Sequence, residues 1–474
     1  MSNDPALEAA KKNHPIALYF IFWGEFAERS SYYGMRAILF LFMTKELMFA
    51  KADANSYIFM FKMACYLLPL VGGYLADRWL GKYWTIVGFS IPYVLGQVLL
   101  AFSDQFFVFF ALFLLACGSG VTKPNISALL GQTYDQRRPG NLGLRAKAFL
   151  WFYFSINVGA LLSQFFLPII RDQYGYKIAF LIPAVLMVGA LIAFALGKPF
   201  YAKETPGPAP ELTEEQRAER WKVLKPLFGV FALIVLFWIP YEHNDTQWVD
   251  FAGEHMDLNT PWLANLGGPA KMSADAFQWA NALMVIILLP FFQWFYGRFD
   301  PKNRISPITK MFYGFLFTAM GPLVLMLCSI ATKQGVVVSA MWLIPAYMLL
   351  TVGEVLVYGT ALDLSYGQAP SYMKSLITAC FLLTNAVANL INIRWTRVYE
   401  GDLSMAWNFT LDDAALAALK KAPTIPIDAT TFFAIDMALP LIGAALIYYV
   451  GSRFHHEHKR LADIEDMRLA EDPK

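Results

Sequence analysis

Acidic, basic and phenolic side chains gather near the start of the chain, in the segment WGEFAERSSYYGMRAIL (residues 23–39). The charged and phenolic members of this segment are Glu25, Glu28, Arg29, Tyr32, Tyr33 and Arg36. On an α-helix, residues four positions apart share a face. One helical stripe would therefore carry acid, base, phenol and base in turn. Such a stripe can take up protons and can recognise a charged ligand.

Glu25 and Glu28 lie close enough on one helix to repel each other when both are ionised. In an apolar setting, this repulsion and the loss of water favour a proton on one of the two carboxylates. The pair is therefore a candidate for proton uptake near neutral pH. The alternative is a buried ion-pair network that only holds this helix to its neighbours.

Composition indicates the class of protein in which these charges lie. Of the 474 residues, 57% are hydrophobic and 16% are charged, and the net charge is +2. Soluble domains carry about 25% charged residues, whereas many runs here reach the ~20 apolar residues that span a bilayer. The charge balance gives no indication of a nucleic acid partner. The cysteines stand in apolar runs without paired spacing, which predicts reduced thiols and no metal site: Cys65, Cys117, Cys328 and Cys380.

Twelve apolar segments predict an all-α membrane protein built from two six-helix bundles. They are 16–47, 54–76, 83–102, 106–131, 146–170, 178–198, 225–250, 276–298, 308–330, 335–366, 371–399 and 430–453. A Pro-rich, charged stretch separates the halves and could include one short surface helix. The predicted division is a bundle at 1–198, a cytoplasmic linker at 199–224, a bundle at 225–454 and a cytoplasmic tail at 455–474. Two such halves resemble transporters of the major facilitator type, whose site lies between them.

Positive charge in the short loops predicts the orientation of the chain. The loops that would share a side with the linker carry more Lys and Arg than the opposite set. Both termini are therefore expected in the cytoplasm, and the absence of a signal peptide favours a bacterial inner membrane or an equivalent plasma membrane. Two outer loops are long, at 251–275 and 400–429. The second has helical periodicity and is interpreted either as a packed lid or as a connector.

Three further charged residues stand inside apolar segments. They are Lys123, Glu242 and Glu354. A charge at the membrane centre costs ~2.5–3.5 kcal/mol on insertion scales, so each is a functional hypothesis. The structural alternatives are a lysine that snorkels from a helix end, a surface position for Glu242 with His243 and Asp245, and a helix-packing hydrogen bond for Glu354.

Several motifs together resemble the proton-coupled oligopeptide transporters, a family of the major facilitator superfamily. The ExxER motif and its tyrosine pair stand at 25–33, and GSGVTKPNISALLG stands at 118–131. The FSxNxGA and PxxMKS elements stand at 154–160 and 370–375, and Glu354 matches the family's helix 10 glutamate.

The resemblance implies uptake of di- and tripeptides with protons, by a monomer without a cofactor. It assigns substrate binding to Arg29, Tyr32, Tyr33, Arg36, Tyr66, Lys123, Asn157 and Glu354. Within this set, Lys123 and the Arg29 region would receive the peptide carboxylate, and Glu354 with Asn157 the ammonium group. Proton coupling is assigned to Glu25, Glu28 and Glu242, the last by pairing with Arg36 across the halves.

The sequence departs from the family pattern at helix 7, where His243 stands in place of the usual glutamine. Histidine adds a group that titrates near neutral pH. Lys62 has no role in the resemblance and is expected near the outer surface. The motif GGYLADRWLGK (72–82) allows close helix approach, and Asp77 within it is expected to cap or pair with a neighbouring helix.

Two other function classes are open to this sequence. One is a proton-coupled transporter of another small solute, such as nitrate, an amino acid or a drug. Glu354 argues against a small anion, which it would repel unless protonated. The other is a membrane-embedded enzyme or a receptor. No Walker A motif or recognisable Ser/His/Asp set supports an enzyme, and HHEH at 455–458 is interpreted as part of a solvated tail.

Overall fold

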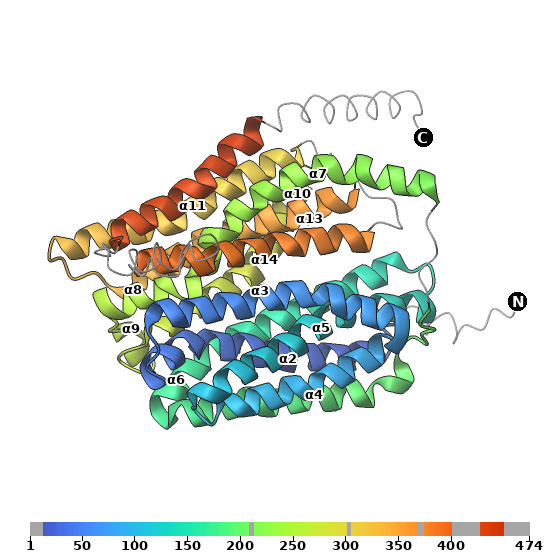
Figure 1. Cartoon of the computed structure of the whole chain (residues 1–474), viewed down its shortest axis with the longest axis horizontal. Coiled ribbons are helices and arrows are strands. Elements are labelled where there is room, and N and C mark those ends of the chain that lie inside the picture. Colours follow the sequence, from blue (N-terminus) through green and yellow to red (C-terminus); the bar gives the residue numbers. More distant parts are fainter. Residues whose placement is uncertain (1–12, 208–212, 301–304, 368–373, 401–426, 450–474) are drawn as a thin grey trace, which may run out of the picture. The chain divides into compact units, whose positions relative to one another are not determined.

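The computed structural model describes residues 13–207, 213–300, 305–367, 374–400 and 427–449 (Figure 1). Over these residues the chain is mainly helical, and ten helices are long and apolar enough to cross a membrane. It divides into two compact units. Unit 1 is Met1–Glu211 with Asp275–Ala282, and unit 2 is Leu212–Ala274 with Leu283–Lys474. The predicted all-α membrane fold is confirmed, while the count of twelve and the cytoplasmic termini stay predictions.

Unit 1 begins with α2 (Ala17–Leu41), which carries the charged stripe and runs into the π-helical turn η1 (Phe42–Glu46). Its other long helices are α3 (Lys51–Leu75), α4 (Lys82–Leu100), α5 (Gln105–Arg137) and α6 (Leu142–Leu196). The turn η2 (Ala76–Leu80) joins α3 to α4. At Gly175 the φ angle is 81°, so α6 consists of two helices that meet at a sharp bend. This break agrees with the two separate runs predicted at 146–170 and 178–198.

Close packing fixes α2 against α6. Gly159 of α6 lies so near α2 that a Cβ atom there would be 2.8 Å from the carbonyl oxygen of Phe26. Gly72 similarly lets α3 approach α5, where a Cβ would come within 2.7 Å of Val121 Cα. The Asn125 amide donates to the Gly72 carbonyl oxygen at 3.3 Å across the same contact. Small residues therefore set the positions of the three helices that carry the charged stripe, Tyr66 and Lys123.

Unit 2 contains most of the remaining helices. They are α7 (Glu214–Tyr241), η4 (Glu242–Asp245), α8 (Gln247–His255), α9 (Pro261–Ala264), α10 (Trp279–Phe299), α11 (Pro307–Lys333), α12 (Leu343–Glu354), η7 (Val355–Gly359), α13 (Thr360–Gly367), α14 (Lys374–Tyr399) and the helix Ala429–Tyr449. The first four residues of α10 belong to unit 1. Buried aromatic and aliphatic side chains, among them Phe237, Phe315 and Phe381, form a core between α7, α11 and α14.

Two expectations about the middle of the chain need correction. The predicted helix at 225–250 ends at Tyr241, one residue after Pro240, and a 3-10 turn and the short helix α8 follow. The surface helix expected in the linker is instead the first part of α7, because strong helix formers from Glu214 onward continue into the apolar run. The predicted lid at 400–429 lies almost wholly outside the described residues.

Candidate functional site

The charged stripe of α2 forms a buried ion cluster in unit 1. Arg29 Nε donates to Glu25 Oε1 at 2.8 Å, which confirms the predicted contact four residues apart. The same nitrogen lies 2.5 Å from Glu28 Oε2. The exposed fractions of Glu25, Glu28 and Arg29 are only 2%, 0% and 1%. Two carboxylates thus share one guanidinium away from bulk water.

This cluster has unused hydrogen-bonding capacity. Neither Nη1 nor Nη2 of Arg29 has a hydrogen-bond partner among the described residues. A buried donor without a partner costs free energy comparable to a lost hydrogen bond, so such groups call for an explanation. A carboxylate that entered the cluster could accept from both nitrogens. The geometry is therefore compatible with binding an anionic group and not only with a structural role.

The phenols beside the cluster are arranged at different depths. Tyr32 is buried, its ring lies 5.3 Å from that of Tyr33, and the Arg29 guanidinium is 5.9 Å from its centroid. Tyr33 and Arg36 are half-buried. The stripe thus changes from fully buried at Glu25 and Glu28 to partly accessible at Arg36.

Lys123 on α5 stands near the same cluster. It interacts electrostatically with both Glu25 and Glu28, and its ammonium nitrogen lies 5.3 Å from the centre of the Tyr66 ring. Its side chain is exposed although the helix on either side is largely buried. Unit 1 therefore brings together predicted residues from three helices: Glu25, Glu28, Arg29, Tyr66 and Lys123.

Asn157 on α6 is a separate element of the predicted site. It is buried, and its amide nitrogen donates to the Tyr153 carbonyl oxygen at 2.9 Å within the same helix. The amide oxygen is therefore the atom through which Asn157 could accept from an ammonium group.

Glu354 occupies a special backbone position in unit 2. It is the last residue of α12 and directly precedes the π-helical turn η7. Single π-helical turns inside longer helices are frequent at functional sites. Its side chain is half-buried. Because Lys123 and Glu354 belong to different units, their predicted opposition stays a prediction, as does the pairing of Glu242 with Arg36.

Glu242 lies in the turn η4 that follows α7. It is 1% exposed and accepts a hydrogen bond from Asn385 of α14 at 2.8 Å. His243 and Asp245 are also buried, at 0% and 2% exposure. The alternative that these three residues lie at the surface is therefore wrong, because the chain turns back toward α8 and α14 instead of leaving the bundle.

The position expected for Lys62 is also wrong. This lysine is fully buried, and its ammonium nitrogen lies 4.8 Å from the centre of the Phe59 ring. Attraction between a cation and an aromatic face strengthens when water is excluded, which compensates part of the cost of burial.

Sequence reasoning missed Asn385 and Asp436. Asp436 accepts from Trp395 Nε1 at 3.3 Å and contacts His243 Nδ1 at 2.7 Å. It is the only acidic or basic residue within Ala429–Tyr449. Glu354 was selected because it is a charged residue inside an apolar segment, and the same criterion would have selected Asp436. Asn385, Asn389 and Asn392 recur at helical spacing on α14 and are all buried, a polar stripe that was visible in the sequence.

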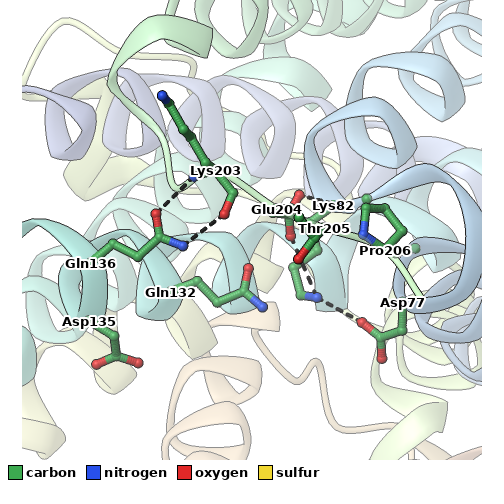
Figure 2. Close-up of a pocket in the computed structure, with 11 residues that line it drawn as sticks. Asp77, Lys82, Gln132, Asp135, Gln136, Lys203, Glu204, Thr205 and Pro206 are labelled. Atoms are coloured by element: carbon green, nitrogen blue, oxygen red, sulfur yellow. Dashed lines mark hydrogen bonds and ion pairs between the residues drawn. The ribbon is translucent and has the colours of Figure 1, made fainter. Parts of the chain in front are cut away.

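A polar cavity of about 330 Å³ lies in unit 1, beside the segment 198–207 that follows α6 (Figure 2). Glu204 accepts from the backbone nitrogens of Lys82 and Tyr83 at 2.6 and 3.2 Å, and a carboxylate at this helix start is stabilising. Lys82 Nζ lies 2.8 Å from Asp77, which confirms the expected pairing of that aspartate. The cavity lining contains none of the predicted substrate or proton residues, and its ion pairs hold the segment to α4.

The four cysteines carry free thiols, as predicted. Within the described ranges, no group of three or more His, Cys, Asp or Glu side chains could hold a metal ion. The HHEH sequence lies outside these ranges.

Comparisons with known proteins show the family of this chain. The model of the POT family (PTR2) matches residues 83–213 and 209–404, so the chain belongs to the POT family. It is 30% identical over 356 residues to Peptide transporter family 1 of Drosophila melanogaster, covering 65% of this chain and 47% of that protein. It is 26% identical over 448 residues to the uncharacterized transporter YclF of Bacillus subtilis, covering 82% and 88%.

The fold agrees with a solved structure of the same family. The in meso crystal structure of the POT family transporter PepTSo matches with a TM-score of 0.77 and 25% identity, covering 94% of this chain and 99% of that one. The chain spans about half the length of several animal relatives that it matches. The protein is thus a multi-pass membrane protein of the POT family.

Proposed function

We propose that this protein is a proton-coupled symporter that imports di- and tripeptides by alternating access. It works as a monomer without a cofactor, in a bacterial inner membrane with both termini in the cytoplasm. Support comes from family membership, from the peptide transporters among its relatives, and above all from one observation. In unit 1, two buried carboxylates share the Arg29 guanidinium in the neighbourhood of Lys123.

This cluster links proton binding to substrate binding. With Arg29 charged and both carboxylates ionised, the three groups carry one net negative charge in a buried place, which favours uptake of a proton. A peptide carboxylate that binds Arg29 and Lys123 brings another negative charge. Its binding is therefore stronger when Glu25 or Glu28 is protonated. In this proposal, proton and peptide promote each other's binding, as a symporter requires.

The remaining residues have roles in the same scheme. Glu354, with the amide oxygen of Asn157, receives the peptide ammonium group. Tyr32, Tyr33 and Tyr66 contact the backbone or line the space for side chains without demanding one chemistry. Arg36 and Glu242 form an ion pair that breaks when the Glu242 carboxylate is protonated. A proton or a peptide shifts the equilibrium between the two transport conformations only by the difference in its affinity for them.

Transport in proteoliposomes tests the proposal. With an inward proton gradient and labelled dialanine outside, we expect accumulation that ends when a protonophore collapses the gradient. Excess unlabelled dipeptide should compete, whereas nitrate or free alanine should not. Absent uptake, or uptake unaffected by the gradient, would contradict peptide symport, and competition by nitrate or alanine would favour another solute.

Lys123→Ala tests the carboxylate contact in the same system. Loss of a hydrogen bond to a charged group costs ~1.5–3 kcal/mol, so peptide uptake should fall roughly 10- to 100-fold. Lys45→Ala, at an exposed lysine of η1, is the matched control and should transport normally. A Lys123→Ala protein that is folded and transports like this control would exclude the assigned role.

A further inference from the structure

The segment 198–207, which follows α6, is held by the backbone to α5. The Gln136 amide of α5 donates to the Lys203 carbonyl oxygen at 2.8 Å and accepts from the Lys203 backbone nitrogen at 2.9 Å (Figure 2). The Thr133 hydroxyl, one turn earlier on the same helix, accepts from the Ala202 nitrogen at 3.1 Å. Two successive residues of the segment are thus paired with one face of α5. We call the segment 198–207 the strap.

The strap also contacts unit 1 near both of its own ends. Near its start, the ring of Phe200 is stacked on that of Phe20 in α2, with 5.5 Å between the ring centres. At its other end, the Gly207 nitrogen donates to the Asp77 carbonyl oxygen of η2 at 3.1 Å. The strap is therefore docked along its whole length and not only where it leaves α6.

Glu204 fixes the middle of the strap to the start of α4. Its Oε2 accepts from the backbone nitrogens of Lys82 and Tyr83 at 2.6 and 3.2 Å. The first nitrogens of a helix have no partner within the helix, and Gly81, which precedes α4, has no side chain to cap them. A Cβ atom at Gly81, where φ is 76°, would lie 3.2 Å from the Glu204 carboxylate. Glycine thus leaves room for a cap supplied from 122 positions away.

Docking of the strap shortens the chain that connects the two units. Unit 2 begins at Leu212, and its first helix, α7, begins at Glu214. An extended chain spans at most ~3.5 Å per residue, so the connector from Gly207 to Glu214 reaches at most roughly 25 Å. Without docking, the connector would start at Leu196, the end of α6, and would reach roughly 60 Å. The docked strap therefore limits how far α7 can move from unit 1.

We propose that the strap stays docked on unit 1 throughout the transport cycle, anchored by Glu204, and that it limits the distance over which the two units move. This inference rests on the proposed function, because it concerns the exchange between the conformations of alternating access.

Hydrogen exchange of the full-length protein in detergent tests the docking without transport. Five backbone amides donate across strap contacts and should be protected in wild type: Lys82, Tyr83, Ala202, Lys203 and Gly207. Glu204→Ala should make all five exchange at least ~10-fold faster, because loss of a hydrogen bond to a charged group weakens the docked state by a factor of roughly 10 to 100.

Asp135→Ala is the matched control for this measurement. Asp135 lines the same cavity but pairs with Arg145 instead of the strap, so its removal should change the exchange of none of the five amides. Unchanged exchange in Glu204→Ala would overturn the proposal. Faster exchange confined to Lys82 and Tyr83 would also overturn it, since Glu204 would then cap α4 without anchoring the strap.

A shortened connector tests the limit on motion. Deletion of 208–210 should lower proton-driven dialanine uptake by at least ~5-fold, because the connector would then reach only roughly 15 Å. Replacement of the same residues by three glycines keeps the length and should transport normally. Adding Glu204→Ala to the deletion should restore at least about half of the lost uptake, because an undocked strap returns about ten residues to the connector. Normal uptake after the deletion, or no recovery with Glu204→Ala, would overturn the proposal.

The two measurements separate this inference from the proposed function. If wild type takes up no dialanine in a proton gradient, the proposed function fails, and hydrogen exchange still shows whether Glu204 anchors the strap. If wild type transports dialanine and tolerates the deletion, the limit set by the strap fails while the proposed function stands.

Discussion

The two buried acidic regions of the molecule balance their charges in different ways. In unit 1, Glu25 and Glu28 share Arg29, whose guanidinium stays charged at every accessible pH. In unit 2, Glu242 accepts from the Asn385 amide, and Asp436 contacts the His243 imidazole. Because Arg29 always carries a positive charge, at least one of its two carboxylate partners must stay ionised to balance it. In the second region, the acidic groups accept from or contact an amide, an indole and an imidazole.

The largest expected effect tests the dependence of unit 1 on its cation. Arg29→Gln leaves two buried carboxylates without a guanidinium, and breaking a buried ion pair from one side costs ~3–5 kcal/mol. We expect a strongly lowered thermal midpoint in detergent, recovering partly in acid as the carboxylates become protonated. Lys45→Gln, at an exposed position, provides the control. An Arg29→Gln protein as stable as the control would show that the cluster does not depend on permanent positive charge.

A smaller effect is expected when the neutral donor of unit 2 is removed. Asn385→Ala removes the buried hydrogen bond to the Glu242 carboxylate, and the loss of a hydrogen bond to a charged group costs ~1.5–3 kcal/mol. Asn265→Ala, at an exposed residue after α9, should unfold at the wild-type temperature. If Asn385→Ala destabilised the protein as much as Arg29→Gln, the contrast between the two regions would not hold.

The smallest effect concerns a histidine outside the membrane segments. Burial, aided by Lys147 and Arg138, lowers the pKa of His14, whose Nδ1 lies 2.6 Å from the Tyr134 hydroxyl. The unfolded chain then binds this proton more readily than the folded one. The contribution of His14 to stability is therefore complete above the unfolded pKa of about 6.5 and is lost as the pH falls toward the folded value.

His14→Gln should accordingly reduce the loss of thermal stability on acidification from neutral pH, by no more than a few degrees. His255→Gln serves as the comparison, since that side chain is exposed. If wild type and His14→Gln lost thermal stability equally on acidification, His14 would not contribute to that loss, and it would come from the buried ion pairs alone.

Sequence reasoning succeeded where the interacting residues are close together in the chain. Four-residue spacing was enough to predict the contact between Glu25 and Arg29, and apolar runs gave most helices. It failed for partners brought together by the fold, since Asp436 is 193 positions from His243 and Asn385 is 143 from Glu242. Lys62 was placed wrongly because an isolated lysine usually reaches for the membrane surface, whereas this one lies over Phe59.

Helix ends were predicted less well than helix positions. The end of α7 at Tyr241 depends on tertiary contacts of η4 that the apolar pattern of 225–250 does not contain. The π-helical turn after Glu354 is equally invisible, because nothing in its composition differs from the helix on either side. Both irregularities lie beside predicted functional residues, where local sequence preference and final structure are expected to disagree.

The central claim is that the carboxylates of α2 couple proton movement to peptide movement, and Glu28→Gln tests it most directly. Proton-driven accumulation and counterflow exchange of labelled dialanine should be measured on the same proteoliposomes, with Lys45→Gln as control. We predict that driven accumulation falls by at least ~10-fold while exchange stays within ~3-fold of wild type, because only driven uptake requires a proton on this residue. Equal loss of both activities would contradict the claim and assign Glu28 to peptide binding or to structure.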